Sequence, residues 1–353
     1  MIKPARSSDS VVVIFLLSFA FLFPACQTAP PASPGSGPLT LDHYLAVVNG
    51  NGGYLSFVLP SNGMHFPGPA VGAIYPQSVR SCGERLVVVN SSGNNLRLYG
   101  ARTPNVPAGT IQFEPGTNPV EIAFADCETA YVSCYDAGRI LKVDMASLSV
   151  AATLAVPPAQ GSNPDGLAIA GGKLYVGLPG FGSGRTVGIV DLSSFSFTAA
   201  SPVTVGENSQ TLLVAGGRVH VLCTSGYNPD WTNKLQGSVH VIDPSTDQVE
   251  RIVDLTGSDP AFGTAAENGR VFVSGWEGGL MCYDAATGIV LRGLGNPVAR
   301  PASGGLMGLA SSGSHLWACA FMEDSILEFD SDTFAATRSF PVGSQPGVLA
   351  FVP

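Results

Sequence analysis

The sequence carries little charge, and positive charge is the scarcer sign. Charged residues make up 12% of the 353 positions, with 17 Lys and Arg against 26 Asp and Glu, which gives a formal net charge of −9. Proteins that bind nucleic acid attract the phosphate backbone with clustered basic residues. The composition therefore excludes nucleic acid as an expected partner.

Motifs for metal binding and catalysis are also missing. The five histidines do not recur at the spacing of a metal-binding helix, and there is no HExxH or Cys-x-x-Cys motif. Gly182-Ser183-Gly184 lies in a glycine-rich loop without the strand-to-helix elbow that a nucleophilic serine needs. We predict no metal site, no cofactor and no catalytic residue, so the sequence favours a non-enzymatic function. The histidines are His43, His65, His220, His240 and His315.

The cysteines do not predict a disulfide framework, although six of them follow Cys26. We expect Cys127 at a hairpin turn and Cys134 at the far end of the next strand, about 20 Å away at the rise of a strand. A disulfide needs Cα atoms within about 7 Å. We therefore expect most of these thiols to be free, buried and packed as small apolar groups. The six are Cys82, Cys127, Cys134, Cys223, Cys282 and Cys319.

What the sequence does contain is one short pattern, repeated seven times about every 40 to 52 residues. Each copy contains two apolar strands in succession. The third position of the first strand is valine in six copies and Ala318 in the seventh. His220 stands where other copies have an aromatic residue, so we interpret it as a packed substitute. Short β-branched strands between Gly, Pro and Asn turns are typical of propeller blades. The second strands end at Leu59, Gly100, Asp144, Asp191, Asp243, Asp284 and Asp330.

Five of these seven strand ends are aspartate, and we interpret them as structural. An aspartate that leaves a strand can accept hydrogen bonds from backbone N–H groups one or two residues further on. Such bonds close a tight turn. These carboxylates are therefore not assigned to a binding site.

The repeats predict an all-β fold, a seven-bladed β-propeller of four-stranded antiparallel blades over residues 40–353. Each unit opens with an inner strand and closes with an outer one. The first unit lacks an inner strand, whereas the segment at 345–351 is an inner strand without a unit. We predict that the C-terminal strand closes the ring by pairing into blade one, residues 348–351 beside residues 45–48. Closure removes an open sheet edge.

The strand motifs resemble a known family. Tyr131-Val132-Ser133, Tyr175-Val176-Gly177 and the Val-x-Val-Ile-Asp strand at residues 239–243 are similar to those of the YVTN family of seven-bladed propellers. The resemblance covers nearly the whole chain after the amino-terminal segment. It implies the fold but not one function, because relatives include surface-layer proteins and lactonase-like enzymes.

The amino terminus has the features of an export signal. Lys3 and Arg6 precede an apolar run over residues 11–23, which is too short to span a bilayer comfortably. We therefore predict a signal peptide of the lipoprotein type over residues 1–25.

Cys26 indicates how the exported protein is held. Preceded by Ala25, it resembles the acceptor cysteine of a bacterial lipobox. A Pro-, Ala-, Ser- and Gly-rich stretch follows, so residues 26–39 are expected to be a lipidated cysteine and a flexible tether. The predicted location is the bacterial outer membrane or cell surface, with membrane contact through the lipid. A periplasmic side and a secreted protein are the alternatives.

Two insertions between strands suggest a binding face. Residues 179–185 in blade four and residues 224–234 in blade five are long, lie in neighbouring blades, and combine aromatic, hydrogen-bonding and cationic groups, as interface hot spots do. A tryptophan at the matching turn of blade six extends this patch. The candidates are Phe181, Arg185, Tyr227, Asn228, Asp230, Trp231, Lys234 and Trp276. Idle surface loops are the alternative.

The central channel is the other candidate region. Asp165, in Asn163-Pro164-Asp165-Gly166, is the best placed carboxylate, and Glu121 and Glu207 lie near other inner strands. A lone Asp before Gly is usually a turn residue. The sequence thus favours a monomeric binding or scaffolding module for an envelope or surface protein or an extracellular ligand. The alternatives are a lactonase-like hydrolase with a divalent metal in the channel and a structural envelope component without a small ligand.

Overall fold

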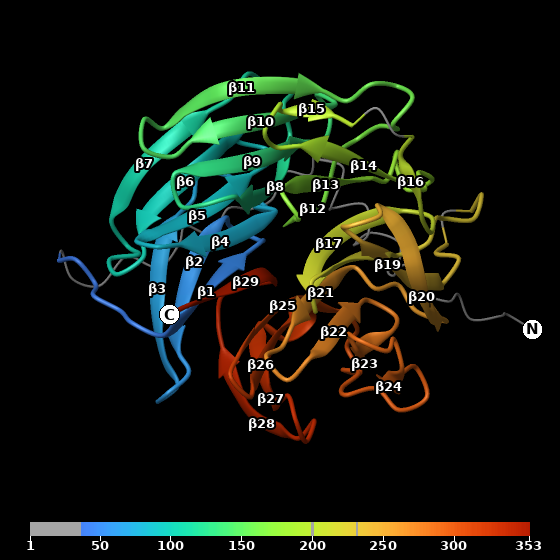
Figure 1. The fold of residues 1–353 in the computed structure, drawn as a ribbon. Helices are drawn as coiled ribbons and strands as arrows, with labels where there is room; N and C mark the ends of the chain where they lie inside the picture. Colours follow the sequence, from blue (N-terminus) through green and yellow to red (C-terminus); the bar gives the residue numbers. More distant parts are fainter. Residues whose placement is uncertain (1–36, 199–200, 231) are drawn as a thin grey trace, which may run out of the picture.

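The computed structural model describes residues 37–198, 201–230 and 232–353. In these ranges the chain forms seven antiparallel sheets arranged as a ring, which Figure 1 shows roughly along its axis. The predicted all-β, seven-bladed propeller is confirmed. The predicted signal peptide, Cys26 and most of the predicted tether lie outside the described residues.

Each blade runs from an inner strand at the centre of the ring to an outer strand at its rim. Blade one contains β29 (Pro346–Val352), β1 (Tyr44–Asn49), β2 (Tyr54–Leu59) and β3 (Met64–Ala70). Blade two contains β4 (Ser78–Cys82), β5 (Arg85–Asn90), β6 (Asn95–Gly100) and β7 (Pro107–Gln112). Blade three contains β8 (Pro119–Phe124), β9 (Thr129–Cys134), β10 (Arg139–Asp144) and β11 (Ser149–Ala155).

Blade four differs at its rim, where two short strands both pair with the third strand. It contains β12 (Leu167–Ala170), β13 (Lys173–Leu178), β14 (Thr186–Asp191), β15 (Ser196–Phe197) and β16 (Val203–Thr204). Blade five contains β17 (Ser209–Ala215), β18 (Arg218–Cys223), β19 (Gln236–Asp243) and β20 (Gln248–Thr256). Blade six contains β21 (Phe262–Ala265), β22 (Arg270–Gly275), β23 (Gly279–Asp284) and β24 (Val290–Arg292).

Blade seven contains β25 (Leu306–Ser312), β26 (His315–Ala320), β27 (Ser325–Asp330) and β28 (Ala336–Pro341). The 3₁₀ turn η3 (Phe321–Glu323) joins β26 to β27. Across the described ranges, helical structure nowhere reaches the length and apolar content of a membrane-crossing segment.

The ring closes as the sequence predicts. β29, the last strand, pairs antiparallel with β1, placing Phe351 opposite Leu45 and Val348 opposite Val48. In Figure 1 the red C-terminal strand lies beside the blue first strand. Blade one is thus assembled from both ends of the described chain, and its sheet has an inner strand like the others.

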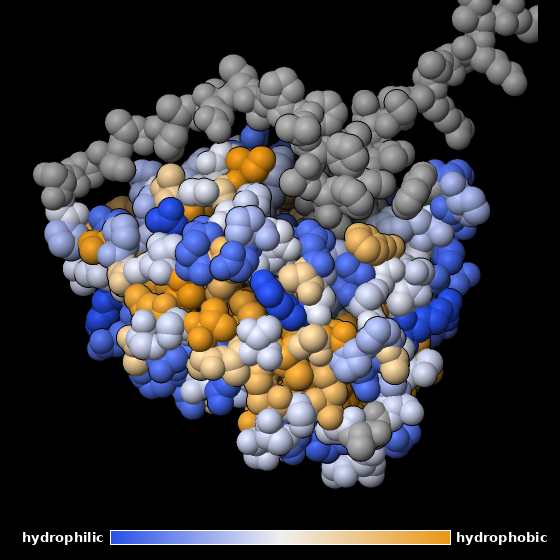
Figure 2. Space-filling view, turned by 90° about the horizontal axis from the view of Figure 1, so that it is seen from above, coloured by the Kyte–Doolittle hydropathy of each residue, from blue (hydrophilic) through white to orange (hydrophobic). Residues whose placement is uncertain are grey.

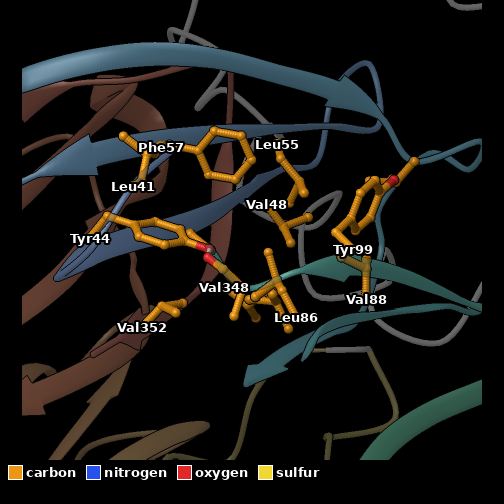
Figure 3. Close-up of a cluster of buried hydrophobic side chains, with 14 residues drawn as sticks. Leu41, Tyr44, Val48, Leu55, Phe57, Leu86, Val88, Tyr99, Val348 and Val352 are labelled. Atoms are coloured by element: carbon orange, nitrogen blue, oxygen red, sulfur yellow. Dashed lines mark hydrogen bonds between the residues drawn. The ribbon is translucent and has the colours of Figure 1, made fainter. Parts of the chain in front are cut away.

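The second strand of each blade is buried along nearly its whole length, because blades cover both of its faces. The core between blades one and two is an example (Figure 3). The ring of Tyr44 packs edge-on against Phe57 at 5.6 Å between centroids, and its hydroxyl donates to the Ala101 carbonyl at 2.7 Å. Burial of each such large apolar side chain contributes about 1.5–3 kcal/mol.

The rim of the ring is mixed in polarity. Figure 2 looks from above onto the side where β11 lies at the top of Figure 1, and shows apolar surface between hydrophilic margins. β11 contributes to this side, since its sequence SVAATLA has no charged residue and Val150 is 40% exposed. The outer strand β20 differs, because Glu250, Arg251 and Asp254 interrupt its apolar residues.

The aspartate row closes the turns between third and outer strands. Asp144 Oδ1 accepts hydrogen bonds from the backbone N–H groups of Ala146 and Ser147, both at 2.9 Å. The bonded N–H groups lie two and three residues on, one further than predicted. These bonds hold the pKa of the Asp144 carboxyl below its usual value. Equivalent bonds occur at Asp191, Asp243, Asp284 and Asp330.

The cysteines correct one expectation. Cys82 at the end of β4 and Cys127 in the β8–β9 turn form a disulfide with Cα atoms 5.3 Å apart, linking blades two and three. The prediction of free thiols holds for the other four, which are buried: Cys134, Cys223, Cys282 and Cys319. The two bonded cysteines occupy corresponding hairpin turns of neighbouring blades, and their sequence separation of 45 residues is one blade repeat.

His220 is packed as an aromatic substitute, as predicted. It is fully buried, and its Nδ1 lies 2.8 Å from the Tyr283 hydroxyl of the next blade. Burial lowers the pKa of His220 to about 4, so the ring is neutral at physiological pH. It is a core residue rather than a ligand.

Candidate functional site

The two predicted insertions meet in the structure. Residues 179–185 connect β13 to β14 in blade four. Residues 224–234 connect β18 to β19 in blade five. The loops approach so closely that a methyl group on Gly182 would stand 3.4 Å from the Tyr227 ring. Backbone bonds from Asn208 N–H to Gly184 and from Ser225 N–H to Glu207 tie both loops to the segment that enters β17. We call the area formed by Phe181, Arg185, Tyr227, Asn228, Asp230 and Lys234 the loop surface.

Both cations of the loop surface share one carboxylate. Lys234 Nζ lies 3.0 Å from each carboxylate oxygen of Glu207, and Arg185 Nη2 lies 3.3 Å from Oε2. The Glu207 side chain is 13% exposed, whereas that of Arg185 is 58% exposed. Glu207, a predicted channel candidate, instead faces the loops and pairs with both cations. With Asp230 counted, the charges of the loop surface balance.

The exposed aromatic side chain among the named residues of the loop surface is Phe181. It is 62% exposed and lies in the left-handed backbone region at φ 54°, between two glycines. Its ring packs edge-on against the buried Tyr135 of blade three, with ring centroids 5.7 Å apart. A large apolar ring is therefore held outward in a conformation that side chains rarely adopt, and such backbone strain often accompanies function.

Other predicted residues shape the blade five loop. Tyr227 is partly buried and bridges to Asn233, and burial raises the pKa of Tyr227 to about 12. Asn228 Nδ2 donates to Thr232 Oγ1 at 3.0 Å, and Asp230 Oδ1 accepts from the same hydroxyl at 2.6 Å. The two exposed polar residues thus hold a turn. Trp231 lies outside the described residues.

Trp276 belongs to a different contact. Its ring packs edge-on against Phe321 of blade seven at 6.1 Å, and a methyl group on Gly305 would stand 2.2 Å from it. The backbone N–H of Trp276 donates to Asp259 Oδ2 at 2.9 Å. The ring therefore serves the packing of blades six and seven rather than the loop surface.

The inner strands enclose a central cavity of about 600 Å³. Its charged lining residues come from three consecutive blades. Arg80 on β4 and Glu121 on β8 form an ion pair at 2.6 Å. Glu121 also accepts hydrogen bonds from the Ser78 hydroxyl at 2.7 Å and the Ile122 N–H at 2.8 Å. The third charged residue is Asp165, just before β12.

Asp165 differs from the turn aspartates. No group among the described residues donates a hydrogen bond to its carboxylate. Its backbone N–H donates to the Gly177 carbonyl. Burial, and then the nearby charge of Glu121, raise the pKa of Asp165 to about 8. Gly166 is required next to it, because a Cβ there would stand 2.3 Å from the Gln210 carbonyl. Asp165 therefore points to the cavity without the partners of a turn residue.

Within the described ranges, no group of three or more His, Cys, Asp or Glu side chains is arranged to hold a metal ion. The carboxylates that the sequence suggested for the channel are divided: Glu121 and Asp165 line the cavity, and Glu207 does not.

Comparison with known proteins supports the fold. No known family and no curated protein matches the sequence. Among solved structures, a proposed 6-phosphogluconolactonase from Bacteroides uniformis is similar, with TM-score 0.67 and 10% identity over 88% of this chain and 99% of that one. Hydrazine synthase from Kuenenia stuttgartiensis gives TM-score 0.65 and 14% identity over 79% and 90%.

A third similar structure is apo AztD from Citrobacter koseri, with TM-score 0.59 and 10% identity over 89% of this chain and 98% of that one. At these identities the likeness concerns the fold alone. The chain is a seven-bladed β-propeller whose structural neighbours include 6-phosphogluconolactonase-like and AztD proteins.

Proposed function

We propose that this protein is an exported, lipid-anchored propeller of the YVTN type that acts as a rigid binding or scaffolding module for an envelope or surface protein or an extracellular ligand. The observation that carries the proposal is Phe181, held 62% exposed in the same loop as the exposed Arg185. Aromatic and arginine side chains dominate interface hot spots. The propeller itself is a monomer, and the loop surface is where the partner binds.

The inter-blade disulfide supports export. Disulfides persist in oxidising compartments and are rare in the reducing cytosol. Cys82 and Cys127 are each partly exposed at hairpin turns, so a cytosolic reductant would reach them. An oxidising location agrees with lipidation at Cys26 and with a place at the bacterial outer membrane or cell surface.

The loop surface is tested by removing its exposed groups without disturbing the fold. We choose the double variant Phe181→Ala and Arg185→Ala, because Lys234 still pairs with Glu207 when Arg185 is gone. The matched control is Ile289→Ala with Arg102→Ala, since Ile289 is 61% exposed and the Arg102 side chain 71% exposed on other blades. Each full-length protein is crosslinked and purified from native membranes.

The wild type and the control are expected to retain one crosslinked partner that the loop variant loses, with the melting temperature of both variants nearly unchanged. Equal crosslinking of the loop variant and the wild type would contradict the loop surface as the binding site. If the wild type crosslinks to nothing, the structural envelope component without a ligand becomes the better proposal.

A second candidate is a lactonase-like hydrolase that uses the channel with a divalent metal. The fold likeness to two proposed 6-phosphogluconolactonases and the cavity beside Asp165 favour it. Metal analysis of the purified protein, together with a lactone hydrolysis screen, is the test. A metal-free preparation that hydrolyses no lactone would remove this candidate.

A further inference from the structure

The charge of the central cavity does not balance. Arg80, Glu121 and Asp165 are its charged lining residues, and the 2.6 Å pair between the first two cancels their charges. Glu121 is further satisfied by Ser78 and Ile122. Asp165 is therefore the one ionisable group without a counter-ion among the residues that line the cavity, in a place where an ionised carboxylate is poorly solvated.

The walls around this carboxylate carry apolar and polar groups in similar measure. Inner strands on several blades present aliphatic and aromatic side chains to the same space, and a volume of about 600 Å³ is in the usual range of small-molecule sites. Two amide side chains, Gln77 and Gln210, add hydrogen-bonding groups. The apolar lining residues that keep some exposed surface include Phe124, Ile169, Leu213, Val214, Phe262 and Phe351.

This combination selects a class of ligand. A divalent metal takes about six or more oxygen or nitrogen ligands, or at least three to four protein groups, and the described residues offer no such set. A protonated amine needs one carboxylate for its charge and a few acceptors for its N–H groups. Its hydrocarbon body is suited to the apolar part of the walls.

We propose that the central cavity is a binding site for a small organic ammonium ion, with the Asp165 carboxylate as its counter-ion and the apolar inner-strand side chains around its hydrocarbon part. This site is separate from the loop surface and does not depend on the function proposed for it. When Asp165 is protonated before binding, the ammonium ion replaces the carboxyl proton, which leaves to the solvent.

The test compares two probes of equal length, hexylammonium and hexan-1-ol, by isothermal titration calorimetry on the full-length protein. Three variants accompany the wild type: Asp165→Asn, the control Asp144→Asn in a rim turn, and the loop double variant Phe181→Ala with Arg185→Ala. Binding is measured in two buffers of different ionisation enthalpy, which reports proton release.

The wild type is expected to bind one hexylammonium at least about tenfold more tightly than hexan-1-ol, because the alcohol cannot neutralise the carboxylate. Below the Asp165 pKa of about 8, binding should release up to one proton and tighten as pH rises. Asp165→Asn should lose both the tenfold preference and the proton release. Asp144→Asn and the loop variant should keep them.

Three results would each overturn the site: no hexylammonium binding to the wild type, equal affinity for the two probes, or an unchanged preference in Asp165→Asn. Thermal melting in the absence of probe shows that each variant is folded. A partner lost at the loop surface has no bearing on this result, so the two proposals fail independently.

Discussion

The same side chain behaves in opposite ways at two kinds of position. Asp144 receives two backbone N–H groups, which lower its pKa, whereas Asp165 receives none and its pKa is raised. Asp144 ends the third strand β10 and begins a turn, whereas Asp165 precedes the inner strand β12, and this position alone does not give the direction of its pKa shift. The difference lies in distant strands: the backbone around Asp165 is engaged by Gly177 and Gln210, which leaves no donor for its carboxylate.

Asp165 predicts an unusual pH dependence of stability. In the unfolded chain this carboxyl titrates near 3.8, and in the folded protein near 8. Between these values the folded protein keeps the proton that the unfolded chain has lost, so the free energy of unfolding falls as pH rises through this window. Asp165→Asn removes the effect. The difference in unfolding free energy, Asp165→Asn minus wild type, should increase by roughly 2 to 5 kcal/mol as pH rises from about 4 to about 8. Above pH 8 the difference should stay constant.

Urea unfolding of the wild type and Asp165→Asn across this pH range measures the difference. Asp144→Asn is the control with the opposite sign, because a lowered pKa stabilises the folded state above the unfolded value and this contribution is lost only as pH falls. A constant difference between Asp165→Asn and the wild type at every pH would show that Asp165 titrates normally.

Among the elements, the strands were predictable and some contacts between them were not. Second and third strands repeat seven times with apolar residues at fixed places, because neighbouring blades cover both their faces. The two short outer strands of blade four, β15 and β16, have no repeated apolar pattern in the sequence, so they could not be predicted. Spacing within one blade does not reveal the disulfide, because Cys82 and Cys127 belong to neighbouring blades and are one blade repeat apart.

The hairpin turns that hold this disulfide give an element-scale prediction. Cys82→Ser with Cys127→Ser removes a crosslink over a separation of 45 residues and should lower the free energy of unfolding by roughly 2 to 4 kcal/mol. Guanidinium unfolding with and without a thiol reductant measures it. Reductant should destabilise the wild type to the level of the double variant and leave the variant unchanged. A wild type that reductant does not affect would contradict a stabilising bond.

For the whole molecule, the sequence predicted the number of blades, their four strand positions and the closure, because each follows from the repeat and its incomplete ends. The candidate site was predicted only in part. Neighbouring loops of blades four and five do meet, but the sequence did not show that Glu207 pairs with both cations. That arrangement depends on how adjacent blades are rotated, and no spacing along the chain encodes it.

Closure by β29 makes the stability of the ring depend on its last strand. Leu349 on β29 is 2% exposed and packs in the core that joins blades seven and one. Leu349→Ala should therefore lower the free energy of unfolding of the whole domain by about 2 to 5 kcal/mol. The matched control is Val214→Ala on the inner strand β17, where the side chain is 40% exposed and the expected cost is small.

A stronger change removes residues 346–353, which exposes the edge of β1 and takes away the strand that pairs Leu45 with Phe351. Chemical unfolding should then show lost cooperativity or aggregation, since an open edge is a template for strand addition. A synthetic peptide of the same eight residues, added in trans, should restore a single transition if closure is the cause. Two results together would contradict this dependence: a truncated protein that unfolds like the wild type, and a Leu349→Ala variant with unchanged stability. They would mean that the fold is stable with blade one left open, without pairing between β29 and β1.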